Sequence, residues 1–307
     1  MLLDRIHNVW LATFASSNGW RAVKRLRRQA RAFGFSRERS FFWDESGLDA
    51  DFAKAFERRL RKGIRGFGYW CWKPQVVLQT LRKMSDGDVL LYVDAGCHLN
   101  PSGRERFCDY LDAVSRTNLL VFQYRVPSAN PRGDFEGHFN VESQWTKGDV
   151  LDFFDVRNEG RILRSGQISG GIVLIRKCAE TVRFYEKIVG IFKEHFNLTD
   201  DSPSCASSLP DFRGNRHDQS VFSIMCKLVG YDVHSLSACE FSPYNLSISA
   251  RMQRGVCRSW DEMKGYPIWA KCDISYGWRA WIPHWVKHVG WWMLNLIYKL
   301  TGIRFVT

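Results

Sequence analysis

Asp94 directly follows a short apolar run, residues 89–93, which is β-branched or aromatic and is bounded by glycine-containing turns. This pattern predicts a central strand of an α/β sheet. Ligands of such sheets bind at the carboxyl ends of the strands, so Asp94 is expected where a cofactor, metal or substrate is met. Ala95 and Gly96 leave room for a ligand beside the backbone. The alternative is that Asp94 only caps the next loop.

A second candidate group lies upstream in residues 65–74, RGFGYWCWKP, where two glycines separate aromatic residues and Lys73-Pro74 precedes a predicted helix over residues 75–84. Proline suits the first turn of a helix. Aromatic rings can stack on a base or a sugar, and a lysine at a helix N-terminus can meet a phosphate. The alternative is a hydrophobic plug beneath the sheet, which suits Trp72 better than Lys73 because an unpaired lysine is seldom buried.

Two further groups lie in the second half of the chain. Gly170-Gly171 opens an apolar strand over residues 170–175 and can bring the backbone close to a ligand, or simply allow a bulge. His217-Asp218-Gln219 stands at the start of a predicted helix that continues to Leu228. Polar, titratable residues there can act on a bound anion or an electrophile. The alternative is that Asp218 serves only as the N-cap.

Predicted strands and helices alternate around these candidate residues. A strand at 9–16 precedes a strongly basic helix at 20–33, which is the opening of a βαβ unit. The pattern predicts further strands at 40–43 and 118–124, and further helices at 49–62, 103–115, 148–154 and 178–195. The chain is therefore expected to fold as an α/β protein with a mixed, mostly parallel sheet flanked by helices.

The composition favours a polyanionic partner. Of the 307 residues, 45% are hydrophobic, and 44 Lys+Arg stand against 32 Asp+Glu, a net charge of +12. Such an excess suits nucleic acid, anionic lipid or phosphorylated substrates, and charge alone does not choose among them. The arginines of helix 20–33 can equally form a solvated helix face.

Cysteine usage and apolar runs indicate the compartment. The nine cysteines are scattered without a C-x-x-C pair, which argues against a zinc site and a complete disulfide framework and favours a reducing compartment. The charged start of the chain does not suit a secretion signal, and no apolar run reaches the ~20 residues that span a bilayer. We therefore expect a cytoplasmic protein.

The C-terminal segment differs from the rest. Tryptophans spaced by three, four and seven residues predict a basic amphipathic helix that lies in a membrane interface or, alternatively, packs on the domain. We expect a catalytic domain over residues 1–250 and a C-terminal segment over residues 251–307. The apolar stripe of the predicted helix consists of Trp278, Trp281, Trp285, Val289, Trp292 and Leu296.

The motifs GFGYWCWKP, GDVLLYVDAGCHLN, SGGIVLIRK and RHDQSVFS, in this order, resemble nucleotide-sugar-dependent glycosyltransferases of the GT-A type. The resemblance covers about residues 8–235 and is to retaining families that include glycogenin and bacterial lipopolysaccharide galactosyltransferases, and more closely to bacterial surface-polysaccharide enzymes. It implies a GT-A-like sheet and transfer of a sugar from a nucleotide-sugar to a glycan or lipid-linked acceptor, with retention.

The resemblance also implies roles for the candidate residues. Asp218 and Gln219 match an Asp-Gln pair beside the reacting anomeric carbon, where one of them stabilises positive charge on the sugar ring. Asp94, Lys73 and Arg65 face the nucleotide end. The donor is expected next to Arg65, Trp70, Lys73, Asp94, Ala95, Gly96, Gly170 and Gly171.

Metal binding is where the chain departs from these families. Their strand-end aspartate belongs to an Asp-x-Asp motif that holds a divalent metal on the donor diphosphate. Asp94 matches the first aspartate, but Gly96 occupies the second position. Either Asp94 holds Mn²⁺ or Mg²⁺ with help from His217 or His98, or lysine and arginine side chains neutralise the diphosphate without metal.

These expectations combine into one hypothesis with two rivals. The chain is expected to be a glycosyltransferase of bacterial surface-polysaccharide synthesis, peripheral at the inner face of an anionic membrane and without a specific nucleic-acid partner. The rivals are a non-catalytic nucleic-acid-binding protein, which would use the arginine helix and exposed aromatic residues, and a glycosyltransferase-fold protein without activity.

Overall fold

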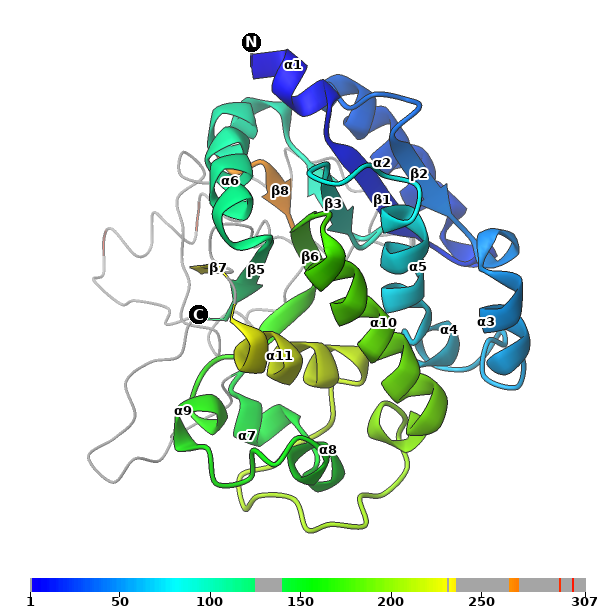
Figure 1. The fold of residues 1–307 in the computed structure, drawn as a ribbon, viewed down its shortest axis with the longest axis vertical. Helices are drawn as coiled ribbons and strands as arrows, with labels where there is room; N and C mark the ends of the chain where they lie inside the picture. Colours follow the sequence, from blue (N-terminus) through cyan, green and yellow to red (C-terminus); the bar gives the residue numbers. More distant parts are fainter. Residues whose placement is uncertain are drawn as a thin grey trace.

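The computed structural model describes residues 2–124, 140–230, 232–235, 265–270, 293 and 300. In these residues a six-stranded sheet crosses the molecule in the order β2-β1-β3-β6-β5-β7, with helices on both faces (Figure 1). A separate two-stranded sheet consists of β4 and β8. The strands are β1 (Trp10–Phe14), β2 (Ser40–Trp43), β3 (Val89–Val93), β4 (His98–Leu99), β5 (Leu119–Gln123), β6 (Ile168–Arg176), β7 (Asp232–Ser235) and β8 (Ile268–Trp269).

The large sheet is mixed. β1 runs parallel to both β2 and β3, and β5 runs parallel to β7, whereas β6 is antiparallel to its neighbours β3 and β5. The register places Val93 of β3 opposite Ile172 of β6, so Gly171 lies next to the residue that follows β3. The predicted α/β class with a mixed, mostly parallel sheet is confirmed.

Two layers of helices cover the sheet. Residues on alternate positions of a strand face opposite sides, and β3 shows this directly: Tyr92 faces the core with α5 and α10, and Leu91 faces the core with α2 and α6. The longer helices are α2 (Trp20–Phe33), α5 (Trp72–Leu81), α6 (Arg104–Thr117), α10 (Ala179–Glu194) and α11 (Asp218–Val229). The shorter ones are α1 (Leu2–His7), α3 (Ala50–Ala55), α4 (Gly66–Tyr69), α7 (Glu142–Trp145), α8 (Gly148–Phe153) and α9 (Gly160–Leu163).

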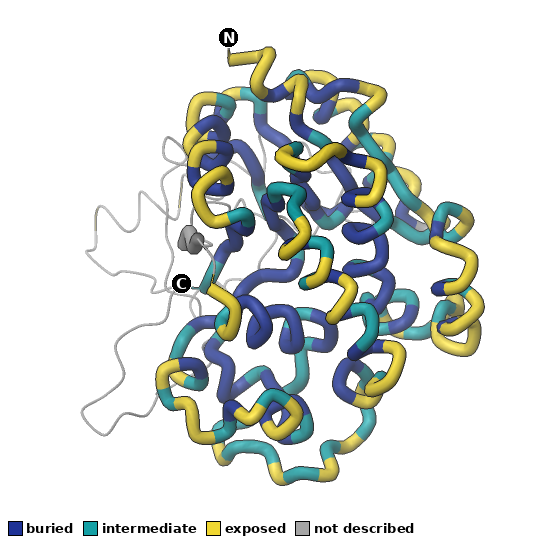
Figure 2. The backbone as a smooth tube through the Cα atoms, viewed as in Figure 1, coloured by how far each residue is buried: buried dark blue, intermediate teal, exposed yellow. Residues whose placement is uncertain are grey.

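Burial follows this layering. Most strand residues and the inward sides of the helices are dark in Figure 2, whereas β2 is of intermediate burial and the outer turns and outward sides of the helices are exposed. In α2, Leu26, Ala30 and Phe33 are buried against the sheet, and the helix ends where Gly34 adopts a left-handed conformation with φ of 106°. A glycine there terminates the helix without steric strain. The predicted helix over residues 20–33 and strand over residues 40–43 are confirmed.

One predicted helix is shorter than expected. Instead of a helix over residues 49–62, the structure has α3 (Ala50–Ala55) followed by turns. The chain leaves the helix at Phe56, whose ring stacks on Phe52 with centroids 4.4 Å apart, and Arg59 then lies 4.4 Å from the centroid of Phe196. Contacts with a residue far along the chain therefore outweigh the local preference for helix in this segment.

Part of the predicted C-terminal segment packs against the rest of the described fold. β8 pairs with β4, and Tyr266 and Ile268 are buried, so residues 265–270 join the core beside the loop that follows Asp94. The division expected at residue 250 and the tryptophan stripe, residues 278–296, lie outside the described residues. Within the described ranges, no helix combines the length and the hydropathy needed to cross a bilayer.

Candidate active site

Asp94 stands at the carboxyl end of β3, as expected. Its backbone N–H donates to the carbonyl of Gly171 at 2.8 Å, and its Oδ1 accepts a hydrogen bond from the Tyr92 hydroxyl at 2.8 Å. Burial, followed by the charge on Asp94, holds the pKa of Tyr92 well above its usual value, so the phenol remains a donor. The backbone and Tyr92 together fix the orientation of the Asp94 carboxylate, of which 33% of the side chain remains exposed.

Lys73 links Asp94 to Asp218. Its ammonium lies 3.4 Å from Oδ1 of Asp94 and 3.0 Å from Oδ2 of Asp218, and only 12% of its side chain is exposed. Burial by itself lowers the pKa of Lys73, but the charges on Asp218 and Asp94 outweigh burial and raise the pKa above its usual value. The two carboxylates that the sequence separates by more than a hundred residues therefore share one buried cation.

Asp218 is the first residue of α11, and His217 rather than Asp218 occupies the N-cap position. The alternative of Asp218 as the N-cap residue is thus wrong. Burial raises the pKa of Asp218 from 3.8 to about 6, against the opposing effect of the Lys73 charge. With 8% of its side chain exposed, Asp218 is a buried carboxylate whose pKa lies well above the usual value for aspartate.

The glycine pair of β6 makes room for these charged side chains. A Cβ on Gly171 would lie 2.8 Å from Oδ2 of Asp94, and one on Gly170 would lie 3.4 Å from Oδ2 of Asp218 and 3.6 Å from Nζ of Lys73. Real Cβ atoms do not approach as closely as the first distance. Gly171 is therefore required by the close approach of Asp94 to the strand, and not by a turn, whereas a Cβ on Gly170 would make ordinary van der Waals contacts.

Gln219 is held by a buried polar network. Its Oε1 accepts from the Gly170 N–H at 3.3 Å, and its Nε2 donates to Oε1 of Gln167 at 2.8 Å. Gln167 donates in turn to Oε2 of the fully buried Glu142 at 3.2 Å, and Lys227 pairs with Oε1 of Glu142 at 2.7 Å. The network fixes which end of the Gln219 amide faces Gly170.

The loop after Asp94 is clamped by the basic helix α2. The Arg25 guanidinium donates to the carbonyl oxygens of Ala95 at 2.6 Å and Cys97 at 2.9 Å. Gln29, one turn later, hydrogen-bonds Nδ1 of His98 at 3.1 Å and accepts from the Leu99 N–H at 3.3 Å. The inner side of this helix thus positions the loop, so the arginine run is more than a solvated face.

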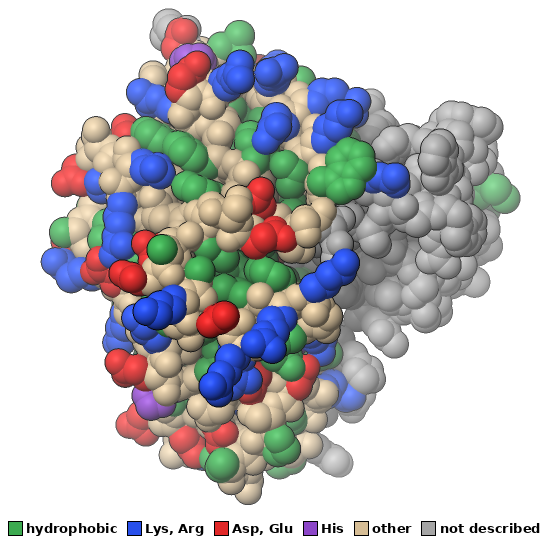
Figure 3. Space-filling view, turned by 90° about the vertical axis from the view of Figure 1, so that its right-hand side faces the viewer, with side chains coloured by type: hydrophobic (Ala, Val, Ile, Leu, Met, Phe, Trp, Pro, Cys, Tyr) green, Lys and Arg blue, Asp and Glu red, His purple; other side chains and the backbone are tan. Residues whose placement is uncertain are grey.

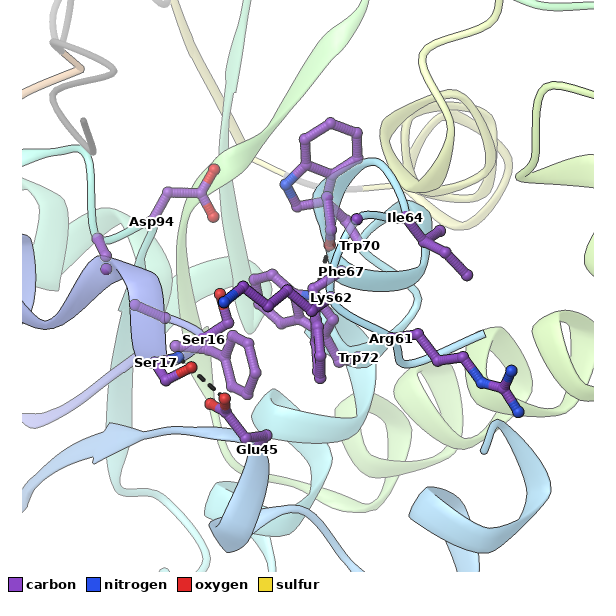
Figure 4. A pocket seen from close by; sticks show the side chains of 16 residues that line it. Ser16, Ser17, Glu45, Arg61, Lys62, Ile64, Phe67, Trp70, Trp72 and Asp94 are labelled. Carbon is purple, nitrogen blue, oxygen red and sulfur yellow. Dashed lines mark hydrogen bonds between the residues drawn. The ribbon is translucent and has the colours of Figure 1, made fainter. Parts of the chain in front are cut away.

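A cavity of about 300 Å³ opens beside Asp94 (Figure 4). In Figure 4 the Asp94 carboxylate and the Trp70 indole stand on either side of the opening, the Lys62 side chain extends across it, and Arg61 points away. The side chains and backbone that line it come from the end of β1, the loop before α2 and the aromatic loop. They are Phe14–Ser17, Gly19, Glu45, Arg61–Ile64, Gly66, Phe67, Trp70, Trp72, Asp94 and Ala95.

The aromatic loop has an unusual backbone. Phe67, Tyr69 and Trp70 have positive φ values of 53°, 53° and 59°, which cost energy for side chains of this size. Trp72, by contrast, is buried and stacks on Phe14 with centroids 4.0 Å apart, and its Nε1 donates to the Gly66 carbonyl. Trp72 is therefore the hydrophobic plug, and Trp70 forms a wall of the cavity.

Two predicted site residues lie apart from the Asp94–Lys73–Asp218 group. Arg65 does not line the cavity, and its guanidinium lies 3.6 Å from Asp201. His217 is buried with a φ of 57°, packs against Tyr69 and Trp70, and hydrogen-bonds the Thr199 carbonyl through Nδ1 at 2.7 Å. Its Nε2 is 3.8 Å from Asp201, which is too far for a hydrogen bond, and it has no hydrogen-bond partner among the described residues.

The residues available for a metal ion are few. His98 is buried in β4 and bonded to Gln29, and Gly96 is buried in the turn after Asp94. Among the residues that the structure describes, no three His, Cys, Asp or Glu side chains form a group that could hold a metal ion. Among the described residues, Asp94 and Glu45 are the carboxylates that line the cavity, and Lys73 already stands beside Oδ1 of Asp94.

The sequence did not identify Tyr92, Arg25 or Gln167. Tyr92 could have been found, because residues two apart on a strand lie on the same face and Asp94 follows two positions later. Arg25 and Gln167 reach their partners across 70 and 52 residues of sequence, and no local pattern indicates such contacts.

Solved structures similar to the chain include three with broad coverage. A mouse xyloside xylosyltransferase 1 has a TM-score of 0.45 and 11% identity, with 88% of this chain and 99% of that chain covered. A glycosyltransferase involved in glycosylation of the major capsid of PBCV-1 has a TM-score of 0.42 and 11% identity, with 92% of this chain and 99% of that chain covered. An active-site variant of LgtC has a TM-score of 0.43 and 12% identity, with 91% of this chain and 95% of that chain covered.

Each of these three structures is of a glycosyltransferase. The sequence motifs of the chain resemble the same class of enzyme. No protein-family model matches the chain, and no curated protein matches it.

Proposed function

We propose that the protein is a glycosyltransferase that moves a sugar from a nucleotide-sugar donor to a glycan or lipid-linked acceptor. One observation carries the proposal: the ammonium of Lys73 lies between the carboxylates of Asp94 and Asp218, next to a cavity at the carboxyl end of the central strands. Substrate sites of α/β sheets are found at this end.

The charge arrangement suits the departure of a nucleotide from a sugar. As the bond between the anomeric carbon and the phosphate oxygen breaks, negative charge grows on the phosphate and positive charge grows on the sugar ring. Asp218 offers a fixed negative group for the ring, and Gln219 offers the Oε1 that faces Gly170. Lys73 keeps both carboxylates in place, and Lys62 at the cavity supplies a cation for the phosphate.

The cavity suits the nucleotide part of the donor. Trp70 and Phe67 present aromatic surface for a base or ribose, and Ser16 and Ser17 add hydroxyl groups beside Asp94. A volume of about 300 Å³ lies at the lower end of the range for small-molecule sites. We therefore place the nucleotide between the aromatic loop and the end of β1, and the sugar toward Asp218.

A divalent metal stays a prediction in this proposal. The described residues do not form a metal centre on their own, since His217 is bonded to Thr199 and Lys73 contacts Asp94. We derive no step of the reaction from a metal ion. The cations Lys73 and Lys62 are the groups of this chain that we assign to negative charge near Asp94.

The acceptor, the stereochemistry and the location are proposed on the motif resemblance and the charge. We propose retention of configuration, a role in bacterial surface-polysaccharide synthesis, and a peripheral position at the inner face of the membrane. The net charge of +12 supports an anionic surface as partner. The division into residues 1–250 and 251–307 is part of the same proposal.

Nucleotide binding provides the first test. We expect UDP, GDP or CMP to raise the thermal unfolding midpoint of the purified protein, with the measurement repeated in Mn²⁺ and in EDTA to report on the metal. Stabilisation by a nucleotide that is absent in Asp94→Asn supports the donor site. No stabilisation by any nucleotide, together with salt-dependent binding of oligonucleotides, would instead favour the nucleic-acid-binding rival.

A further inference from the structure

A second hollow, of about 480 Å³, lies along β2, away from the Asp94 site. β2 is the edge strand of the described sheet, and the hollow is bounded by this strand, the second half of α2 and the loop between them. It is lined by Arg27, Ala30, Arg31, Phe35, Arg37, Ser40, Phe41, Phe42 and Trp43. We name it the β2 groove.

The charged residues of the β2 groove are all positive. Arg27 and Arg31 come from α2 and Arg37 from the following loop, and no acidic side chain lines the groove. In the part of the chain that the structure describes, no ion pair joins these arginines to a carboxylate. The adjacent acid, Glu38, accepts a hydrogen bond from Ser36 at 2.6 Å. Arg37 has the charge of Glu38 nearby, whereas no carboxylate of the described residues pairs with Arg27 or Arg31, so the three arginines together suit an anionic ligand.

Aromatic residues form the rest of the groove. The Arg27 guanidinium lies 4.9 Å from the centroid of Phe42, on the α2 side of β2. Phe41 stacks between Trp10 and Trp43, with centroids 5.7 and 5.4 Å away, on the other face of the strand. The three aromatic residues of β2 are only partly buried. Figure 3 shows the face that is on the right in Figure 1, where Lys and Arg side chains gather in the upper part with hydrophobic side chains between them.

We infer that the β2 groove binds the phosphodiester headgroup of an anionic phospholipid. The guanidinium forks match phosphate oxygens, and the partly buried Trp43 at the edge strand is of the residue type enriched at membrane interfaces. The chain carries a net charge of +12, which attracts it to an anionic leaflet. The inference gives the proposed peripheral location a specific contact, but it does not depend on sugar transfer because binding needs neither donor nor acceptor.

Vesicle sedimentation with charge-matched variants tests the inference. The groove variant carries Arg27→Gln, Arg31→Gln and Arg37→Gln, and the control carries Arg21→Gln, Lys24→Gln and Arg28→Gln, positions of α2 outside the groove. Phosphatidylglycerol-containing vesicles should bind wild type, and the groove variant should bind at least about tenfold more weakly. The control should change by less than about threefold, and pure phosphatidylcholine vesicles should bind none of the proteins.

Several outcomes would overturn the inference. If both triple variants weakened vesicle binding equally, binding would come from diffuse electrostatic attraction and not from the β2 groove. Release from vesicles by millimolar inorganic phosphate would assign the groove to a small phosphorylated molecule. If wild type bound oligonucleotides but not vesicles, and the groove variant lost the oligonucleotide binding, the groove would be assigned to nucleic acid.

Thermal unfolding confirms that each variant folds, and the single variant Arg31→Gln replaces the triple variant if the triple variant does not fold. Nucleotide stabilisation at the Asp94 site is measured in parallel, so the two proposals fail separately.

Discussion

A Cβ atom on Gly171 would lie 2.8 Å from Oδ2 of Asp94, so the central strand β6 tolerates no side chain at this position while Asp94 keeps its place. We expect Gly171→Ala to displace the Asp94 carboxylate and to lower the turnover rate by about a hundredfold, the effect of misplacing a catalytic group by about 1 Å. Turnover and thermal unfolding are measured on the same sample.

Gly190→Ala is the matched control for the Gly171 substitution. Gly190 lies within α10, and a Cβ added there would have no neighbour within 4 Å. Alanine in a helix interior stabilises by roughly 0.5–1 kcal/mol relative to glycine, so this variant should be slightly more stable and fully active. Unchanged activity in Gly171→Ala would show that the contact with Asp94 does not matter.

Lys73→Met tests the shared cation. Removing one partner of a buried ion pair leaves the other charge uncompensated. Asp218, with 8% of its side chain exposed, would be left as such a buried charge. We expect the free energy of unfolding to fall by about 3 kcal/mol and activity to be lost. The double variant Lys73→Met/Asp218→Asn should regain part of the stability without activity.

Arg183→Met provides a surface comparison for Lys73→Met. Arg183 and Glu180 form an exposed pair at 3.6 Å, and such pairs contribute less than about 1 kcal/mol. A Lys73→Met protein as stable as Arg183→Met would contradict the buried-bridge assignment.

The pH dependence of stability follows from Asp218. Burial raises its pKa from 3.8 to about 6, so the folded state favours the protonated carboxyl more than the unfolded state does. The stabilisation from Asp218 is therefore fully present below about pH 4 and decreases as the pH rises through about 6. Chemical denaturation of wild type and Asp218→Asn across this range should show the decrease in wild type alone.

The pH dependence of activity has the opposite sign. If Asp218 acts as a carboxylate, the turnover rate should fall as the pH drops through about 6, because the carboxyl becomes protonated. A turnover rate that stays constant well below about pH 6 would remove Asp218 from the reaction.

Arg25→Ala tests whether the basic helix positions the donor site. The guanidinium bonds the carbonyls of Ala95 and Cys97, so its loss should loosen the loop and weaken nucleotide binding by about tenfold. Arg25→Lys should be intermediate, since both carbonyls accept from Nη2 and the shorter lysine side chain does not extend its ammonium as far. Arg28→Ala, at an exposed position of the same helix, should bind nucleotide like wild type; equal weakening in both alanine variants would contradict the positioning role.

Local pattern predicted much of the framework. β1, α2, β2, β3 and α11 follow from apolar periodicity and from turn residues such as Gly34, because these signals are contained within a few residues. The plug-forming role of Trp72 was an open alternative, and burial decides it. The helix predicted to continue to residue 62 instead ends at Ala55, and Arg59 beyond it contacts Phe196, a residue far along the chain.

Long-range relationships could not be predicted from the sequence. The sequence suggested that Asp94, Lys73 and Asp218 share a site, but not that Lys73 contacts both carboxylates, which depends on how α5 and α11 meet β3 and β6. The hydrogen bond from His217 to Thr199 is made by a residue with a positive φ of 57°, which a non-glycine residue rarely adopts. The antiparallel direction of β6 likewise depends on tertiary pairing.

The most direct test of the account is nucleotide release from a panel of UDP-, GDP- and CMP-sugars by the purified protein, with acceptor glycans present and absent. We expect wild type to turn over at least one donor, and folded Asp94→Asn and Asp218→Asn variants to be at least about a hundredfold slower. Release from no donor, or release at wild-type rates by both variants, would contradict the assignment of the Asp94–Lys73–Asp218 group as the site of sugar transfer.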